Sequence, residues 1–280
     1  MRKIKAKKIE QAVERLYIKA NYNLPKDVEQ ALKKSVKNET SKTAKNVLNI
    51  LLENSEISKK ELIPICQDTG LAIVFAEIGQ DVCIVGGGFK EAINRGVKNA
   101  VKQTFLRTSV VGDPFDRINT KNNTPAIIHT DIVPGDKIKI SVMAKGAGSE
   151  NMSALKMLKP SDGIDGVIDF VLDTVKNAGP NPCPPIVVGI GIGGNFEKSA
   201  YLAKRSLLRR LGKNNPQKSI AQLEKLLLSK INKLKIGPSG FGGKTTCLGV
   251  NIETLPCHIA SLPVAVNIEC HAHRHAKVEI

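Results

Sequence analysis

The chain has 280 residues, of which 41% are hydrophobic, and a formal net charge of +16. This length allows a sizeable buried core, and we expect a single domain over 1–280. No apolar run approaches the roughly 18 residues that span a bilayer. The N-terminal stretch MRKIKAKKIEQAVERL carries charges where a signal peptide is apolar. We therefore expect a cytoplasmic protein without a membrane partner.

The basic charge invites comparison with nucleic-acid binders, because a basic stripe is the usual footprint on a phosphate backbone. The lysines are scattered over helical segments at 1–60 and 204–235, however, aromatic residues make up only 4%, and tryptophan is absent. RNA-binding surfaces depend on aromatic stacking. We expect no nucleic-acid partner and a basic surface that attracts anionic substrates.

The predicted elements change in character near residue 61. Residues 1–60 show helical apolar spacing and predict a helical N-terminal segment, with a new helix starting after Pro25. From 61 onward, β-branched runs alternate with Gly, Pro and Asp. These runs predict strands at 71–79, 81–88, 125–133 and 137–148, with a helix at 90–105.

Beyond residue 148, helical and strand patterns alternate. The patterns predict helices at 163–179, 197–212 and 218–234, a strand at 184–194, and strands within 245–280. No repeat, low-complexity segment or linker separates them. The sequence thus predicts an α/β fold of mixed β-sheets with flanking helices, in which 61–280 form the core.

Two glycine motifs resemble nucleotide-binding loops without meeting their requirements. GIGIGG at 189–194 has the dinucleotide spacing, but no acidic residue lies between Glu197 and Glu224 to hold a ribose. GPSGFGGKTT at 237–246 resembles a P-loop, but Pro238 stands where its first glycine is needed. We expect neither a nicotinamide site nor nucleotide hydrolysis.

The six cysteines fall into groups by context, and a reducing compartment argues against disulfides. Cys83 and Cys247 lie within apolar strand-like runs and are expected in the core. Three others lie where an apolar run meets a turn rich in Pro, Gly or polar residues: Cys66, Cys183 and Cys270. Turns of this kind are where binding sites are built.

Three isolated thiols have several possible uses. Ferredoxin-type clusters use four cysteines at close spacing, and structural zinc sites prefer paired ligands. Three ligands around a four-iron cluster would leave one iron able to bind a hydroxyl or carboxylate oxygen. Spacing alone leaves open that the three are unrelated buried thiols, and Cys257 fits no group.

Six sequence blocks resemble, in order, those of the class I, iron–sulfur fumarate hydratases and L(+)-tartrate dehydratases. The blocks are ICQDTG, LRTSVVGDP, KGAGSEN, GPNPCPPIVVGIGIGGNFEKSAYLAKRSLLR, IGPSGFGGKTTCLGV and NIECHAHRHA, and they cover roughly 61–280. The resemblance implies that three cysteines hold a [4Fe–4S] cluster whose remaining iron binds the substrate. Carried over by motif, these are Cys66, Cys183 and Cys270.

The resemblance also assigns roles to residues around the cysteines. Gln67 and Asp68 correspond to residues that contact the substrate, with Asp68 handling the departing or entering water and His258 as its partner. Arg107 matches an arginine that binds a substrate carboxylate, and Gly148 a backbone contact. Without the family, Asp68 reads as a turn former, Arg107 as a surface arginine and His258 as a structural histidine.

The histidines of the last block have no assigned role. Alternation along a strand would place His271, His273 and His275 on one side, near the third cysteine. Substrate contact and a mere lining role both remain open.

Single-chain members of the family continue into a second domain, whereas this sequence ends at Ile280. The resemblance therefore implies the α subunit of the two-subunit form, completed by a separate β subunit in an α2β2 assembly. The implied reaction is hydration of fumarate to L-malate, a step of the tricarboxylic acid cycle. Dehydration of L(+)-tartrate to oxaloacetate is the alternative, and a basic anion- or RNA-binding protein is a distant one.

Overall fold

The computed structural model describes residues 1–104 and 106–280, which form two compact units. Unit 1 comprises Met1–Pro25, Ser55–Ala147 and Arg274–Ile280, and unit 2 comprises Lys26–Asn54 and Gly148–His273. Each unit has its own sheet and hydrophobic core. The two units are defined by the contacts within each of them. That residues 1–280 act as a single functional domain stays a prediction.

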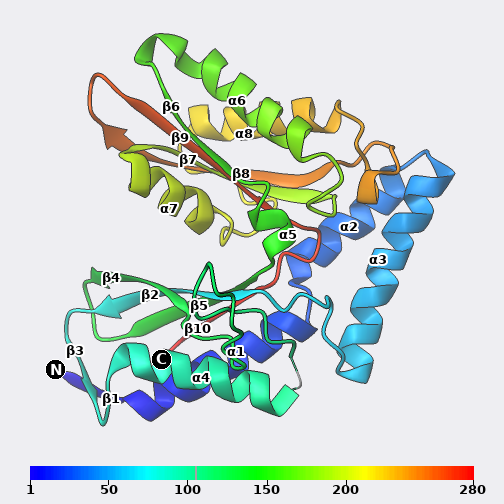
Figure 1. The fold of residues 1–280 in the computed structure, drawn as a ribbon. Coiled ribbons are helices and arrows are strands. Elements are labelled where there is room, and N and C mark those ends of the chain that lie inside the picture. The colour runs from blue at the N-terminus through cyan, green and yellow to red at the C-terminus, as the bar shows by residue number, and fades with distance from the viewer. Residues whose placement is uncertain (105) are drawn as a thin grey trace. The chain divides into compact units, whose positions relative to one another are not determined.

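Unit 1 is built on a four-stranded mixed sheet (Figure 1). In pairing order its strands are β10 (His275–Glu279), β5 (Ile138–Lys145), β2 (Leu71–Gly79) and β4 (Ile127–Val133). Strand β2 is parallel to β4 and antiparallel to β5. A separate parallel pair joins β3 (Val82–Val85) to β1 (Arg2–Lys5), a strand that the sequence did not predict.

Helices α1 (Ala6–Tyr22) and α4 (Phe89–Thr104) cover one face of this sheet (Figure 1). Each buries residues at helical spacing, among them Ile9 and Val13 of α1 and Val97 of α4. Gly96 lets the helices approach closely, because an added Cβ would lie 2.5 Å from the carbonyl oxygen of Glu10. The apolar stripe of α1 therefore serves as one wall of the unit 1 core.

Unit 2 contains a second four-stranded mixed sheet. In pairing order its strands are β6 (Ala154–Leu158), β9 (Leu262–Glu269), β7 (Ile186–Gly194) and β8 (Cys247–Cys257). Strand β7 is parallel to β8 and antiparallel to β9. Because β7 lies between two partners, it reads as a continuous apolar run.

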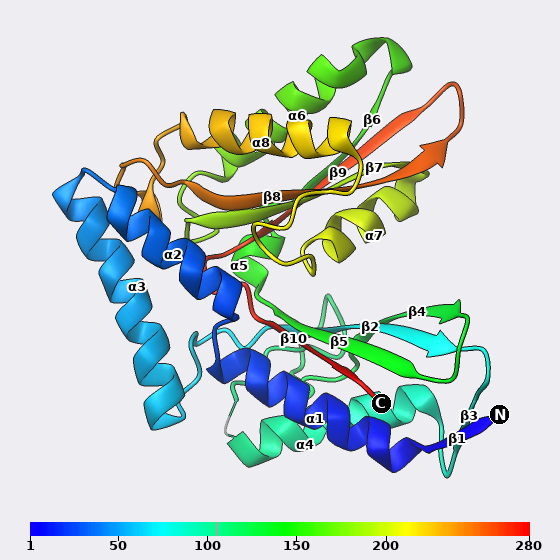
Figure 2. The same ribbon diagram turned by 180° about the vertical axis from the view of Figure 1, so that it is seen from behind.

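Helices cover both faces of the unit 2 sheet (Figure 1 and Figure 2). Helices α6 (Gly163–Ala178) and α8 (Lys218–Asn232) bury apolar stripes on one face, and α7 (Phe196–Ser206) lies on the other. Helix α2 (Lys26–Asn38) also belongs to this unit, and α3 (Lys42–Glu61) runs from unit 2 into unit 1. Short helical turns are α5 (Ala147–Glu150), η1 (Pro160–Asp162) and η2 (Pro238–Gly240).

The glycines of GIGIGG are required by packing. A Cβ at Gly189 would lie 2.2 Å from the carbonyl oxygen of Ala203, and one at Gly191 would lie 2.0 Å from that of Ser199. Both oxygens belong to α7, so the glycines let this helix lie directly on β7. The dinucleotide-like spacing therefore has a structural explanation.

The P-loop-like stretch leads into a strand. η2 begins at Pro238, and β8 follows without the helix that a P-loop requires. At Gly243 an added Cβ would lie 2.8 Å from Oε2 of Glu39. Glu39 is buried and accepts hydrogen bonds from the backbone N–H groups of Thr40, Ser41 and Lys244. This carboxylate thus ties the glycine-rich loop to the end of α2.

Replacing Glu39 by Gln is expected to lower the free energy of unfolding at pH 7 by about 1–3 kcal/mol. Burial raises the pKa of Glu39, but the N–H donors outweigh it and hold the pKa below its usual 4.5. A lowered pKa in the folded state stabilises the chain above the unfolded-state pKa, and this contribution is lost as pH falls. Urea unfolding at pH 7 and pH 3.5 should show a smaller pH dependence in the variant.

Glu29→Gln is the matched control, because Glu29 lies on α2, the helix that precedes Glu39, in an exposed pair with Lys33. Exposed pairs contribute about 0–1 kcal/mol, so this variant should remain near wild type. Equal stability of Glu39→Gln and Glu29→Gln at pH 7 would contradict the anchoring role of Glu39.

The predicted α/β fold with mixed sheets and an N-terminal helical segment is confirmed. The helix predicted at 197–212 ends earlier, at Ser206, and the short strand β6 was missed. Within the described residues, no helix is both long and apolar enough to cross a membrane.

Candidate functional site

Four predicted site residues belong to unit 1: Cys66, Gln67, Asp68 and Arg107. The first three lie in a turn between α3 and β2, so the polar residues precede a strand. The apolar run that meets this turn at Cys66 is therefore not a strand. Leu62 ends α3 with a φ of 51°, and Pro64 cannot donate a hydrogen bond, so the apolar run before Cys66 forms a loop.

Backbone donors fix the Asp68 carboxylate. Oδ1 accepts a hydrogen bond from the N–H of Gly70 at 2.9 Å, and Oδ2 accepts one from the N–H of Ala147 at 2.8 Å. Gly70 has a φ of 73°, and an added Cβ would lie 2.6 Å from the backbone of Lys145. Only glycine fits this position, so the residues after Asp68 hold its carboxylate in one orientation.

Arg107 lies beside the same turn. Its carbonyl oxygen accepts hydrogen bonds from Oγ1 of Thr69 at 2.5 Å and from Nδ2 of Asn123 at 3.0 Å. The Arg107 side chain is exposed, as is that of Gln67, whereas Asp68 is half-buried. Unit 1 therefore brings the backbone of Arg107 to the turn that holds the oriented Asp68 carboxylate.

Three further predicted residues belong to unit 2: Gly148, Cys183 and Cys270. The backbone N and the ring Nδ1 of His271, the residue after Cys270, lie 3.4 Å and 3.0 Å from the carbonyl oxygen of Cys183. A Cβ added at Gly148 would lie 3.8 Å from the carbonyl oxygen of Asn181. The segments that carry both cysteines and the glycine are thus neighbours.

Sheet register explains why the segments that carry these two cysteines are neighbours. Cys183 lies just before β7, Cys270 follows β9 directly, and β9 pairs antiparallel with β7 through Glu269 and Val187. Cys183 is exposed and has a φ of 54°. Non-glycine residues in the left-handed region are uncommon and often mark functional sites.

The cysteines differ in their suitability as metal ligands, which bind as thiolates. Burial raises the pKa of Cys247 to about 12, so this thiol stays protonated, as expected of a core residue. Cys66 and Cys270 are half-buried and Cys183 is exposed, and all three lie outside the strands. Their donor chemistry and accessibility fit a thiolate-bound cluster. Among the residues described, no group of three or more His, Cys, Asp or Glu side chains is placed to hold a metal ion.

The two remaining cysteines, Cys83 and Cys257, lie within or at the end of a strand, unlike Cys66, Cys183 and Cys270. Cys83, expected in the core, is only half-buried within β3. Cys257, which fitted no group, is exposed at the end of β8. Cys83 therefore offers a comparison thiol that lies within a strand of unit 1.

His258 lies at the opposite end of the unit 2 sheet from Cys183 and Cys270. It follows β8, whose end pairs with the far end of β7, where Gly194 is opposite Cys257. Eight strand residues at about 3.3 Å each separate the two ends by roughly 26 Å. Within unit 2, His258 is therefore not part of the group formed by the two cysteines.

The His258 side chain is exposed, and its Nδ1 accepts a hydrogen bond from the N–H of Ala260 at 3.1 Å. It borders an apolar cavity of about 470 Å³. The apolar lining comes from α6, β7, α8, the turn after β8 and the start of β9, and includes Ile164, Ile192, Ile220, Ile259 and Leu262.

The histidines of the last block do not share one side of a strand, so that expectation was wrong. β9 ends at Glu269 and β10 begins only at His275, and the residues between them form a turn. His273 has a φ of 37° and is buried, whereas His271 is half-buried. The segment passes here from unit 2 to unit 1, which strand alternation does not anticipate.

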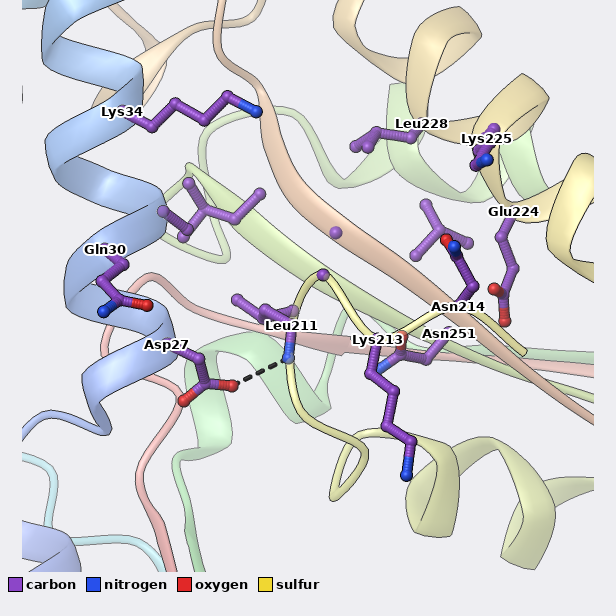
Figure 3. Close-up of a pocket in the computed structure, with 15 residues that line it drawn as sticks. Asp27, Gln30, Lys34, Leu211, Lys213, Asn214, Glu224, Lys225, Leu228 and Asn251 are labelled. Atoms are coloured by element: carbon purple, nitrogen blue, oxygen red, sulfur yellow. Dashed lines mark hydrogen bonds between the residues drawn. The ribbon is translucent and has the colours of Figure 1, made fainter. Parts of the chain in front are cut away.

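A cavity of about 330 Å³, bordered by several charged and amide side chains, lies elsewhere in unit 2 (Figure 3). It lies between α2, the loop after α7, and α8, and Asp27 closes one side by accepting a hydrogen bond from the N–H of Leu211 at 2.8 Å. Lys34, Lys213 and Lys225 also line it. None of the predicted site residues borders this cavity.

Sequence reasoning missed the side chains beneath the Asp68 turn. The Tyr17 hydroxyl lies within hydrogen-bond distance of the carbonyl oxygens of Thr69 at 3.1 Å and Gly70 at 3.0 Å, which share its single proton. Arg274 donates to the carbonyl oxygen of Asp68 at 2.6 Å. The one sequence signal for this support was the arginine among the alternating histidines of HAHRHA.

Comparison with known proteins agrees with the sequence blocks. The sequence model of the fumarate hydratase (Fumerase) family matches residues 10–279. A Methanocaldococcus jannaschii protein, provisionally named L(+)-tartrate dehydratase subunit alpha, is 48% identical over 96% of both chains.

Escherichia coli proteins named L(+)-tartrate dehydratase subunit alpha are also similar. The protein of strain K12 is 33% identical over 90% of this chain and 84% of its own length, and that of O157:H7 is 34% identical over the same shares. The predicted family is thereby confirmed. The chain belongs to the fumarate hydratase family of hydro-lyases.

Proposed function

We propose that this chain is the α subunit of a hydro-lyase for a four-carbon dicarboxylate, and that it hydrates fumarate to L-malate. The observation that carries the proposal is the Asp68 carboxylate, which two backbone N–H groups orient in a turn whose Thr69 hydroxyl donates to the backbone carbonyl of the exposed Arg107. An oriented carboxylate can carry a proton, and a guanidinium can bind a carboxylate through two parallel hydrogen bonds. Membership of the family supports this reading.

The reaction has two difficult parts. Forming the double bond removes a weakly acidic proton from the carbon beside a carboxylate, and hydroxide is a poor leaving group. A [4Fe–4S] cluster on Cys66, Cys183 and Cys270 would supply Lewis acidity to the leaving oxygen through its iron without a protein ligand. Asp68 carries the proton of the departing or entering water in this proposal.

The remaining predicted residues orient the substrate. Arg107 binds one substrate carboxylate, and the exposed amide of Gln67 and backbone N–H of Gly148 contact the substrate. The base that removes the carbon-bound proton comes from a separate β subunit. The word "alpha" in the relatives' names supports such a partner, and we propose an α2β2 assembly.

The position of His258 gives the second α chain a role in this proposal. His258 lies roughly 26 Å along the sheet from the end that carries Cys183 and Cys270. A site that uses these cysteines cannot use His258 of the same unit 2. We infer that each site takes its His258 from the other α chain of the assembly.

Co-expression of differently tagged Asp68→Asn and His258→Asn chains with the β subunit tests this inference. Each variant alone should be nearly inactive. The mixture should recover about one quarter of wild-type turnover, because random pairing makes half of the dimers mixed and each mixed dimer has one intact site. No recovery would contradict the exchange of His258 between copies.

Dehydration of L(+)-tartrate is the second candidate, because the relatives' names favour it. The two substrates differ in one hydroxyl, and a site that hydrogen-bonds a hydroxyl can discriminate strongly against the analogue that lacks it. The α chain, purified with its β subunit under argon, should give a kcat/KM for fumarate or L-malate at least about tenfold above that for L(+)-tartrate. If kcat/KM is instead higher for L(+)-tartrate, tartrate replaces fumarate as the proposed substrate. If the complex turns over neither substrate, the proposed function is wrong.

A further inference from the structure

Arg274 is one of the largest fully buried side chains of the chain, with 1% of its surface exposed. It belongs to unit 1 and follows Cys270 by four residues in the sequence. Burying a guanidinium costs several kcal/mol unless hydrogen bonds compensate. The hydrogen bonds of the Arg274 side chain must therefore offset this cost.

Arg274 holds the backbone of the Asp68 turn. Its Nη1 donates to the carbonyl oxygen of Asp68 at 2.6 Å and to Oδ1 of Asn21 at 3.1 Å. Asn21 in turn donates from Nδ2 to the carbonyl oxygen of Tyr17 at 3.0 Å, within α1. The guanidinium therefore links the turn to the rigid helix beneath it.

Tyr17 completes the support. Its hydroxyl is within hydrogen-bond distance of the carbonyl oxygens of Thr69 and Gly70, at 3.1 Å and 3.0 Å. The carbonyl oxygens of three consecutive residues are thus held by two buried side chains, and the first of the three is that of Asp68. The Arg274 backbone is itself fixed, because its carbonyl oxygen accepts from the N–H of Ala144 on β5 at 3.0 Å.

The Arg274 guanidinium and the Asp68 carboxylate both lie near Gly146. A Cβ added at Gly146 would lie 3.2 Å from both Nη2 of Arg274 and Oδ2 of Asp68. The carboxylate keeps its bond to the N–H of Ala147 only while the Asp68 backbone stays in place. A shift of about 1 Å in a reacting group can lower turnover roughly 10²-fold.

We propose that Arg274 is a positioning residue, which fixes the backbone of Asp68 so that the carboxylate meets the substrate in one orientation. This inference rests on the proposed function of Asp68. Arg274 does not itself contact the substrate. The same short segment of chain thus carries a predicted cluster cysteine, Cys270, and the support of the predicted proton carrier.

Arg274→Met and Arg274→Lys, assayed in the complete complex with the β subunit, test the proposal. Arg274→Met should lower kcat about 10²-fold while KM changes less than about threefold. Arg274→Lys should recover about tenfold of this loss, because the ammonium keeps one donor for the Asp68 carbonyl but lacks the planar fork of Arg. Both variants should retain the wild-type iron content per chain.

A second readout does not depend on the loaded enzyme. Hydrogen exchange of the full-length chain without iron should be about tenfold faster at residues 66–70 in Arg274→Met than in wild type. Arg209→Met is the matched control. Arg209 is a largely buried arginine in unit 2, hydrogen-bonded to Glu224 and Asn251, so its loss should leave exchange at 66–70 and kcat unchanged.

The outcomes separate the two hypotheses. If Asp68→Asn is inactive but Arg274→Met turns over at the wild-type rate, the positioning role is wrong and the proposed function stands. If Asp68→Asn turns over at the wild-type rate, the proposed function is wrong. Should Arg274→Met fail to fold, Asn21→Ala removes the acceptor that orients Nη1, and an unchanged kcat in that variant would equally overturn the positioning role.

Discussion

Cys66→Ser, Cys183→Ser and Cys270→Ser are each expected to abolish both turnover and the iron–sulfur absorbance near about 400 nm. A cluster held by three thiolates has no spare protein ligand, and a serine hydroxyl remains protonated where a cysteine binds as thiolate. Ultraviolet–visible spectra and iron content of complexes purified under argon measure the effect. We expect at least about tenfold less iron in each variant.

Cys83→Ser is the control, because Cys83 is a half-buried thiol of unit 1 that lies within β3. Its spectrum and turnover should match those of the wild type. If Cys83→Ser loses as much iron as the other variants, or if any of the three keeps its colour, the assignment of the ligands is wrong.

Asp68→Asn is expected to keep the absorbance and to lose roughly 10²–10⁴-fold in turnover. The amide can still accept a hydrogen bond from the N–H of Gly70, but it cannot carry a proton between water and substrate. Steady-state rates per bound cluster, in both reaction directions, separate this loss from a loss of iron.

Asp162→Asn is the matched control for this substitution. The exposed Asp162 carboxylate also accepts a backbone hydrogen bond, from the N–H of Lys159 at 2.9 Å, but it lies in unit 2 away from all predicted site residues in the sequence. Its turnover should stay within about twofold of wild type, since surface substitutions away from special features usually have small effects. Near-wild-type turnover of Asp68→Asn would remove Asp68 from the proposed chemistry.

The fold was predictable where a hydrophobic period was long and uninterrupted. The run 71–79 was predicted as a strand and forms β2 over the same residues, and the pattern at 163–179 forms α6. The short strands β1 and β6 were missed, because their pairing partners lie far away in the sequence and contribute no local signal. The division into two units was equally invisible, since each unit combines distant segments.

The site was predictable only as far as its motifs extend. The blocks pointed to Asp68 and Arg107, which the structure brings together in unit 1 through Thr69. They could not reveal that Tyr17 and Arg274, far apart in the sequence, support the same turn. They also could not show that His258 lies at the far end of the sheet from Cys183, because a sequence block carries no strand register.

Iron and acid-labile sulfide analysis of the wild-type α chain, purified with its β subunit under argon and assayed as a hydro-lyase, is the most direct test of the cluster. Our account predicts about four iron and four sulfide per α chain, and turnover that falls in proportion as the iron is removed. Full turnover in a preparation without stoichiometric iron would contradict it.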